Sequence, residues 1–156
     1  MKSFIKILLA AALAMLCLSS CVSKYKKVKI SSCEMESFIP SGLKAFNAVA
    51  RVGIDNPAPA FNIKDIRATI KRDSLDILYV NAENIAVDGK CDKVYRVPVA
   101  GQISKNFSLV QILGIVANFK PEEYRVDING RATIAGNVGK DIVYKDVPLI
   151  KFIEKL

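Results

Sequence analysis

The chain has 156 residues and is basic, with 23 Lys and Arg against 15 Asp and Glu and a formal net charge of +8. It contains no His, which removes the usual general base and the commonest metal ligand. With no Cys/His ligand spacing and no glycine-rich phosphate loop, the sequence predicts no metal site, no cofactor and no enzymatic activity.

The chain begins with a leader. Lys2 and Lys6 precede an apolar run over 7–18, and Ser19, Ser20 and Cys21 follow. A basic start, a short apolar core and small residues before a cleavage point are typical of a secretory signal. The run is shorter than the roughly 20 apolar residues of a spanning helix. We therefore expect residues 1–20 to be removed, which leaves one domain's length of chain.

The end of this leader, Leu18-Ser19-Ser20-Cys21, resembles the lipobox of bacterial lipoproteins. The resemblance implies a lipid thioether on Cys21, cleavage before it and acylation of the new amino end. Two or more acyl chains hold a protein firmly at a membrane. In that family an Asp after the Cys retains many members in the inner membrane, whereas Val22 stands here. The expected location is the outer membrane, facing the periplasm. The alternative is an ordinary signal peptide that happens to hold a Cys near its end.

We expect residues 21–27 to form a short polar tether. A basic cluster, made of Lys24, Lys26, Lys27 and Lys29, begins in this tether and ends just after it. Such a cluster beside a lipid anchor gains roughly 1 kcal/mol per charge at an anionic membrane surface. It could equally be a solvated linker, and the sequence leaves both interpretations open. Nucleic acid is not expected as a partner, because an exported, anchored protein would not meet it.

From Val28 onward the chain alternates apolar and polar residues, the period typical of half-buried strands. Strands are predicted over 28–33, 46–54, 63–71, 77–80 with a bent continuation to 87, 94–99, 124–136 and 142–147. Asp88-Gly89 reads as a hairpin turn, and Pro98 indicates an edge strand. Seven or eight short strands predict a mainly β domain over 28–156, an immunoglobulin- or fibronectin-III-like β-sandwich.

One segment breaks the β pattern. Ser108 and Gln111 have the spacing of a capping box, and apolar residues at helical spacing follow. We predict a short helix over 108–118 that ends before Lys120-Pro121. The alternative is a buried strand with a bulge.

Two cysteines remain in the mature chain beyond the anchor, Cys33 and Cys91. An exported pair can form a disulfide in an oxidising compartment. The closed loop of about 59 residues would contribute roughly 4 kcal/mol in the chain-entropy model. The alternative is two separate buried thiols, and no spacing rule decides between them.

The pair Asn56-Pro57 closes the clearest strand. An Asn side chain can accept a bond from its own backbone two residues on, and Pro fixes the next φ. The pair therefore predicts a rigid strand exit, which is a structural role and not a catalytic one.

The stretch from Ala50 to Pro57, with Phe61 after it, resembles the signature of type-2 late-embryogenesis-abundant proteins, also called water-stress-and-hypersensitive-response domains. Further features follow in the order of that family: Asp88-Gly89, Val97-Pro98-Val99, the helical segment, and a strand that ends at Asn129-Gly130. Ala58 stands where the family usually has a second Asn. The resemblance implies a non-catalytic β-sandwich associated with stress protection.

Together these features predict a non-catalytic, membrane-anchored lipoprotein that serves as a stress-protective, scaffolding or binding module of the bacterial cell envelope. The alternative is a ligand- or partner-binding subunit of an envelope complex that handles lipid, peptide or glycan. A large apolar cavity lined by the helix and Tyr124 would favour that alternative.

Overall fold

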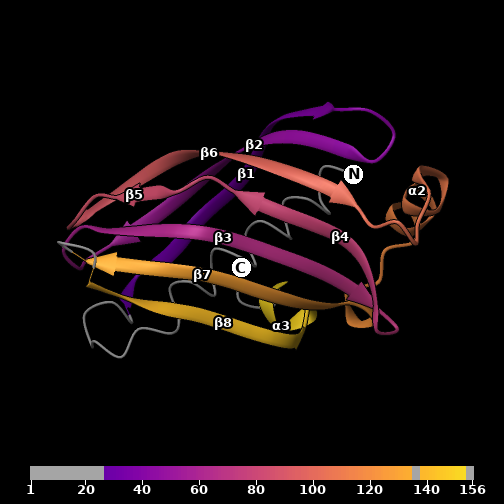
Figure 1. Cartoon of the computed structure of the whole chain (residues 1–156). Helices are drawn as coiled ribbons and strands as arrows, with labels where there is room; N and C mark the ends of the chain where they lie inside the picture. Colours follow the sequence, from indigo (N-terminus) through magenta and orange to yellow (C-terminus); the bar gives the residue numbers. More distant parts are fainter. Residues whose placement is uncertain (1–26, 135–137, 154–156) are drawn as a thin grey trace.

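The computed structural model describes residues 27–134 and 138–153 (Figure 1). In this part of the chain eight strands form one antiparallel sheet in the order β1-β2-β6-β4-β3-β7-β8, with β5 paired to β3. The strands are β1 (Lys29–Pro40), β2 (Ala45–Asn56), β3 (Phe61–Arg72), β4 (Leu75–Ala82), β5 (Ile85–Val87), β6 (Cys91–Ile103), β7 (Arg125–Ile134) and β8 (Val138–Pro148). The helical elements are α2 (Leu109–Ala117), the 3-10 turn η2 (Pro121–Glu123) and α3 (Ile150–Ile153). The prediction of a mainly β fold with one short helix is confirmed, while the predicted leader lies outside the described residues.

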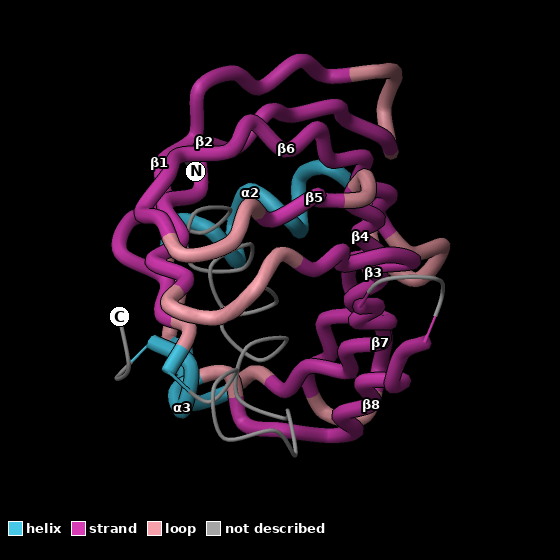
Figure 2. The backbone as a smooth tube through the Cα atoms, turned by 90° about the vertical axis from the view of Figure 1, so that its left-hand side faces the viewer, coloured by secondary structure: helices cyan, strands magenta, loops and turns pink. Residues whose placement is uncertain are grey.

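The sheet bends over on itself, so the fold is sandwich-like. In Figure 2 the strands follow an arc, with β1, β2 and β6 in its upper part and β3, β7 and β8 in its lower part. Strand β6 pairs with β2 along the whole length of β2, Ala45–Asn56, but pairs with β4 only over Val99–Ile103. The two halves are therefore joined at one end of β6 and separate towards the other.

The core lies between these halves and is formed by residues that alternate along each strand with more exposed ones. Strand β2 buries Phe46, Ala48, Ala50, Val52 and Ile54, and their neighbours along the strand, apart from the buried Gly53, are more exposed. Strands β3 and β7 repeat the pattern. A fully buried aliphatic side chain contributes roughly 1.5–3 kcal/mol relative to an exposed one, so the pattern that defines the strands also fixes which face of each lies inward.

The predicted helix is confirmed as α2. The Ser108 hydroxyl accepts a hydrogen bond from the Gln111 amide at 3.3 Å, and the Ser108 amide donates to the Gln111 side chain at 2.8 Å. This reciprocal pair satisfies two of the amide groups that a helix start leaves open. The helix ends at Asn118, whose amide donates to the Gly114 carbonyl.

The expectation that Pro98 marks an edge strand is wrong, because β6 lies inside the sheet between β2 and β4. The Pro98 carbonyl accepts a bond from the Glu83 amide at 3.0 Å. In an antiparallel ladder the N and O of one residue point to the same side, so the missing donor faces the β4 side. Strand β4 ends at Ala82. The β4–β6 ladder therefore stops before a further hydrogen bond would require the Pro98 nitrogen as a donor.

The expectation of a hairpin at Asp88-Gly89 is also wrong. Strand β5 before this turn pairs with β3, and β6 after it pairs with β2 and β4. The turn is held instead by the β2–β3 loop, where the Ala58 carbonyl accepts a bond from the Lys90 amide at 3.0 Å. The turn thus carries the chain from one half of the sandwich to the other.

The two edge strands of the sheet are irregular. Strand β1 has register shifts between Ile30 and Ser32 and between Met35 and Ser37. Strand β8 is bulged near Asp146, whose φ is +54°. Bulges of this kind bend an edge and interrupt its row of backbone donors and acceptors.

Candidate functional site

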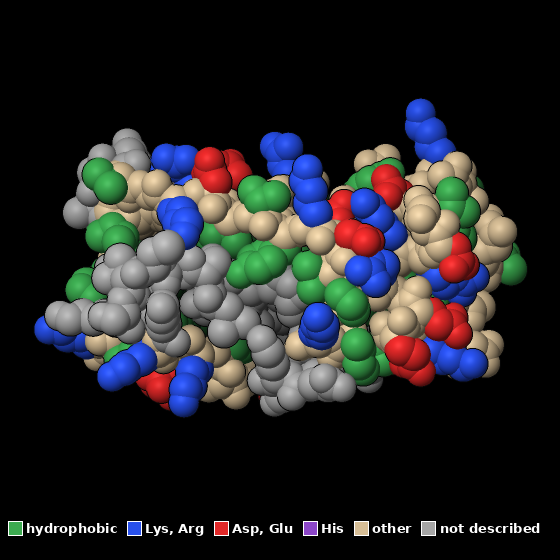
Figure 3. Space-filling model, turned by 90° about the horizontal axis from the view of Figure 1, so that it is seen from below, with side chains coloured by type: hydrophobic (Ala, Val, Ile, Leu, Met, Phe, Trp, Pro, Cys, Tyr) green, Lys and Arg blue, Asp and Glu red, His purple; other side chains and the backbone are tan. Residues whose placement is uncertain are grey.

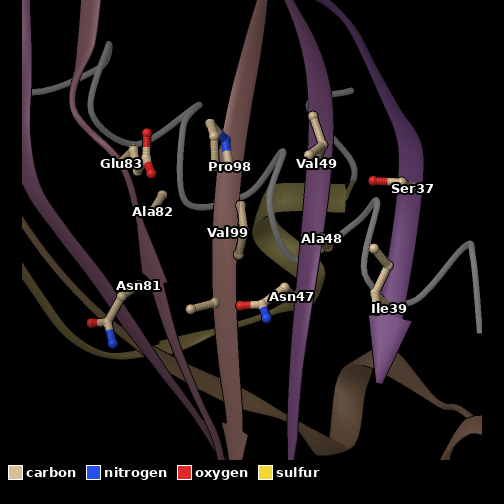
Figure 4. A pocket seen from close by; sticks show the side chains of 11 residues that line it. Ser37, Ile39, Asn47, Ala48, Val49, Asn81, Ala82, Glu83, Pro98 and Val99 are labelled. Atoms are coloured by element: carbon tan, nitrogen blue, oxygen red, sulfur yellow. The ribbon is translucent and has the colours of Figure 1, made fainter. Parts of the chain in front are cut away.

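The outer face of the sheet carries a shallow hollow of about 370 Å³ across β1, β2, β6 and β4. Two rows of cross-strand neighbours line it (Figure 4). One row runs through Ile39, Asn47, Ala100 and Asn81, and the other through Ser37, Val49, Pro98 and Glu83. In these rows β6 contributes the short side chains of Pro98 and Ala100, while longer side chains, those of Ile39 and Glu83, stand at one end of each row.

The lining combines an apolar centre with amides at its border. Val49, Pro98 and Ala100 form the centre, and the Asn47 and Asn81 side chains are exposed beside them. Side-chain amides both donate and accept hydrogen bonds, so this surface is suited to a ligand with its own amide or hydroxyl groups. The lining also includes Glu83, whose carboxylate can accept hydrogen bonds.

An ion pair borders the hollow on the side of Ser37. Arg96 donates from Nε to one Glu36 oxygen at 2.9 Å and from its terminal nitrogen to the other at 2.6 Å. Glu36 is the extra residue of the second β1 bulge, which turns its side chain outward. The hydrogen bond from Arg96 lowers the pKa of the Glu36 carboxyl below its ordinary value.

A second polar network lies on β3, β7 and β8. Lys71 forms a salt bridge with Asp127, and Asp127 accepts a bond from the Asp146 amide at 2.7 Å. Arg125 in turn donates to the Asp146 carboxylate at 2.7 Å. Acidic and basic side chains also lie side by side on the face seen in Figure 3, without a continuous field of one sign. We infer that the network stabilises the β8 bulge at Asp146.

Asp127 makes stability depend on pH. Partial burial alone would raise its pKa, but the hydrogen bonds from Lys71 and from the Asp146 amide outweigh burial, so the pKa is lowered from 3.8. A carboxyl with a depressed folded-state pKa stabilises above its unfolded pKa and loses that contribution as pH falls through the folded value. We expect the free energy of unfolding to fall below about pH 4, and to fall less in Asp127→Asn.

Urea unfolding at pH 7 and pH 3 measures this effect. At pH 7, Asp127→Asn should cost about 0.5–1 kcal/mol, as expected for a partly exposed pair. Asp55→Asn is the matched control, because Asp55 is exposed and has no ion pair among the described residues. An equal acid sensitivity in Asp127→Asn and the wild type would contradict the assignment.

The predicted anchor site lies at and beyond the start of the described chain. Cys21, Lys24 and Lys26 lie outside the described residues, whereas Lys27 and Lys29 are exposed at the beginning of β1. These two lysines are therefore available to an anionic surface at this end of the sheet.

The two cysteines are not joined in the structure. Cys33 is opposite Val52, whereas Cys91 is opposite Asn56, on the other side of β2. Four residues along a strand correspond to about 13 Å, well beyond the span of a disulfide. The register therefore agrees with the alternative of two separate thiols. The Cys91 thiol donates to the Asp88 carbonyl at 3.6 Å.

Asn56 occupies a structural position. Its side chain is fully buried, and its oxygen accepts a bond from the Ala58 amide at 2.9 Å, two residues on. Its nitrogen donates to the Pro59 carbonyl at 3.3 Å and to the Asp88 carbonyl at 2.9 Å. The amide thus closes the β2 exit that precedes Pro57 and ties it to the β5–β6 turn.

The hollow was not predicted from the sequence, and Tyr124 does not line it. Tyr124 is buried and packs against Phe119 with ring centroids 5.0 Å apart, and its hydroxyl accepts a bond from Arg72. Alternation indicates which residues of a strand face outward, but only the register of four strands brings Ser37, Val49 and Asn81 together. The outward-facing small residues of β6 were the available signal.

Within 27–134 and 138–153, no cluster of three or more His, Cys, Asp or Glu side chains is arranged to hold a metal ion. The helices of this part of the chain are too short or too polar to cross a membrane.

No family model matches the sequence, and no curated protein is significantly similar to it. Among solved structures, the chain is similar to the crystal structure of a protein from Archaeoglobus fulgidus, with 14% sequence identity and a TM-score of 0.47. The similar region covers 74% of this chain and 91% of that one. These values identify neither a family nor an activity.

Proposed function

We propose that this chain is a non-catalytic lipoprotein of the bacterial cell envelope, in which a sandwich-like domain is held at a membrane by a lipid on Cys21. The role is that of a scaffolding, binding or stress-protective module, as the resemblance to type-2 late-embryogenesis-abundant proteins implies. The location that the residue after Cys21 favours is the outer membrane.

The observation that carries this proposal is where the domain begins. Lys27 is exposed six residues after Cys21, and β1 starts at Lys29 as an edge strand. A lipid on Cys21 can therefore reach a bilayer without any strand leaving the sheet. Lys27 and Lys29 would then lie close to the lipid head groups, where each charge contributes roughly 1 kcal/mol.

Replacing Cys21 with alanine should abolish the incorporation of labelled palmitate and move the protein from the membrane pellet to the soluble fraction. The physical reason is the loss of acyl chains, each buried CH₂ of which contributes about 0.8 kcal/mol. Cys17→Ala is the matched control, since it changes a cysteine four positions earlier and should remain labelled and anchored. Labelling that persists in Cys21→Ala would contradict the anchor.

A second function, a ligand- or partner-binding subunit of an envelope complex, is favoured by the hollow on the outer face. Its apolar centre and bordering amides at Asn47 and Asn81 suit a peptide or glycan. A photo-crosslinking residue at Ala100, applied to the anchored protein in membranes, separates the two functions. A stoichiometric adduct at Ala100 but not at Val143 on β8 would favour the complex subunit, and its absence would favour the stand-alone module.

A further inference from the structure

The outward face of α2 is apolar and open to solvent. Leu109, Val110 and Leu113 are 43%, 78% and 47% exposed, and the nine residues of the helix include no charged side chain. The opposite face packs inward through Ile115, which is buried, and Ile112. A surface helix normally carries charged residues on its outer face, and a helix that is apolar all round belongs in apolar surroundings. The outer face of α2 is thus suited to an apolar environment outside the domain.

This face continues onto the turn between β1 and β2. The Lys44 carbonyl accepts a bond from the Ile103 amide at 2.7 Å, and Lys44 Nζ donates to the Lys105 carbonyl at 3.5 Å. The turn therefore lies against the segment that leads into α2, and Leu43 is 79% exposed on it. Figure 1 shows α2 and this turn at the same end of the molecule. We call Leu43, Leu109, Val110 and Leu113 the apolar tip.

The chain segments that carry the apolar tip contain charged residues of one sign. Residues 37–47 and 99–120 contain Lys44, Lys105 and Lys120 and neither Asp nor Glu. Lys44 and Lys105 have no ion pair among the described residues, whereas Lys120 lies 3.8 Å from Glu123 of η2. An apolar surface with a basic border complements an anionic bilayer. It does not complement a second copy of itself, because the lysines of two tips would be brought together.

We propose that the apolar tip inserts into the head-group region of an anionic lipid bilayer, with Lys44 and Lys105 against the lipid phosphates. This contact does not depend on a lipid at Cys21. The tip lies at the opposite end of β1 from Lys27, and a 12-residue strand spans about 36 Å. A chain held at both ends would either lie along one bilayer or connect two membrane surfaces.

The absence of Trp from the chain provides a direct test. Val110→Trp and Val143→Trp each place one fluorescent reporter, the first in the apolar tip and the second at an exposed position of β8. Both are made in the full chain carrying Cys21→Ala and titrated with phosphatidylcholine vesicles, with or without phosphatidylglycerol. We expect the Val110→Trp emission to shift to the blue and to be quenched by brominated lipid when phosphatidylglycerol is present. The Val143→Trp emission should not change.

The lysines are tested in the same titration. Removing Lys44 and Lys105 with serine substitutions should weaken binding by about fivefold for each charge. Lys64→Ser with Lys145→Ser removes the same total charge elsewhere and should have a smaller effect. A Val110→Trp emission that shifts with protein concentration in the absence of vesicles would assign the tip to self-association and overturn the proposal. An emission that responds to neither vesicles nor concentration would overturn it as well.

Discussion

Replacing Asn56 with alanine is expected to lower the free energy of unfolding by about 3 kcal/mol. The substitution leaves three backbone groups without their partner: the Ala58 amide and the Pro59 and Asp88 carbonyls. A buried polar group that loses its hydrogen bond costs roughly 1–3 kcal/mol. Asn56 and Ala58 are buried, so the Ala58 amide loses its partner where water has little access, whereas the bonds to the Pro59 and Asp88 carbonyls are partly buried.

Urea unfolding at neutral pH measures this loss, with Asn129→Ala as the control. Asn129 is exposed on β7, and its replacement should change stability by less than about 0.5 kcal/mol. Asn56→Asp is a finer test, because the aspartate keeps an acceptor for the Ala58 amide but has no donor for the Pro59 and Asp88 carbonyls. It should be at least as destabilising as Asn56→Ala. Equal stability of the Asn56 and Asn129 variants would show that the loops are held by other contacts.

Replacing Gly101 with alanine should destabilise the domain by about 1–3 kcal/mol. A Cβ at this position would lie 2.0 Å from the ring of Phe46, its neighbour across the β2–β6 ladder. The ring is buried and packs against Phe38, with centroids 5.0 Å apart. It can make room only by disturbing that contact or by becoming exposed, so the site is too closely packed for even one methyl group.

Gly114→Ala is the matched control, because it makes the same chemical change in α2. No atom lies within 4 Å of a Cβ at Gly114, and alanine favours a helix over glycine by up to about 1 kcal/mol. The same substitution should therefore lower the melting temperature at Gly101 and raise it or leave it unchanged at Gly114. A Gly101→Ala protein as stable as the wild type would mean that the Phe46 ring is not fixed in this position.

Local patterns in the sequence predicted much of the fold. Alternation located β2, β3 and β7, and the capping box of Ser108 and Gln111 located the start of α2. Between the strands predicted over 63–71 and 77–80, Asp73 and Ser74 form the turn, both at positive φ, as a two-residue hairpin requires. The first strand was predicted over 28–33, whereas β1 continues to Pro40, and its alternation is interrupted by bulges between Ile30 and Ser32 and between Met35 and Ser37.

Features that depend on distant partners could not be predicted in the same way. The Asn56 side chain suggested a local turn, but its bond to Asp88 joins residues 32 positions apart. The place of Pro98 inside the sheet depends on where β4 stops, and the hollow depends on the register of four strands. Each of these is set by long-range pairing, which the alternation of a single strand does not encode.

The irregular β1 edge has a consequence for crowding. Strand β1 offers at most four consecutive regular residues, 32–35 and 37–40, on either side of its second bulge. Proteins confined to a surface collide often and in similar orientations, which favours the growth of fibrils from open strand edges. Short regular stretches give an approaching copy too few backbone bonds to form a lasting ladder. Held at a membrane as proposed, the domain would therefore meet its neighbours along β1 without forming such a ladder.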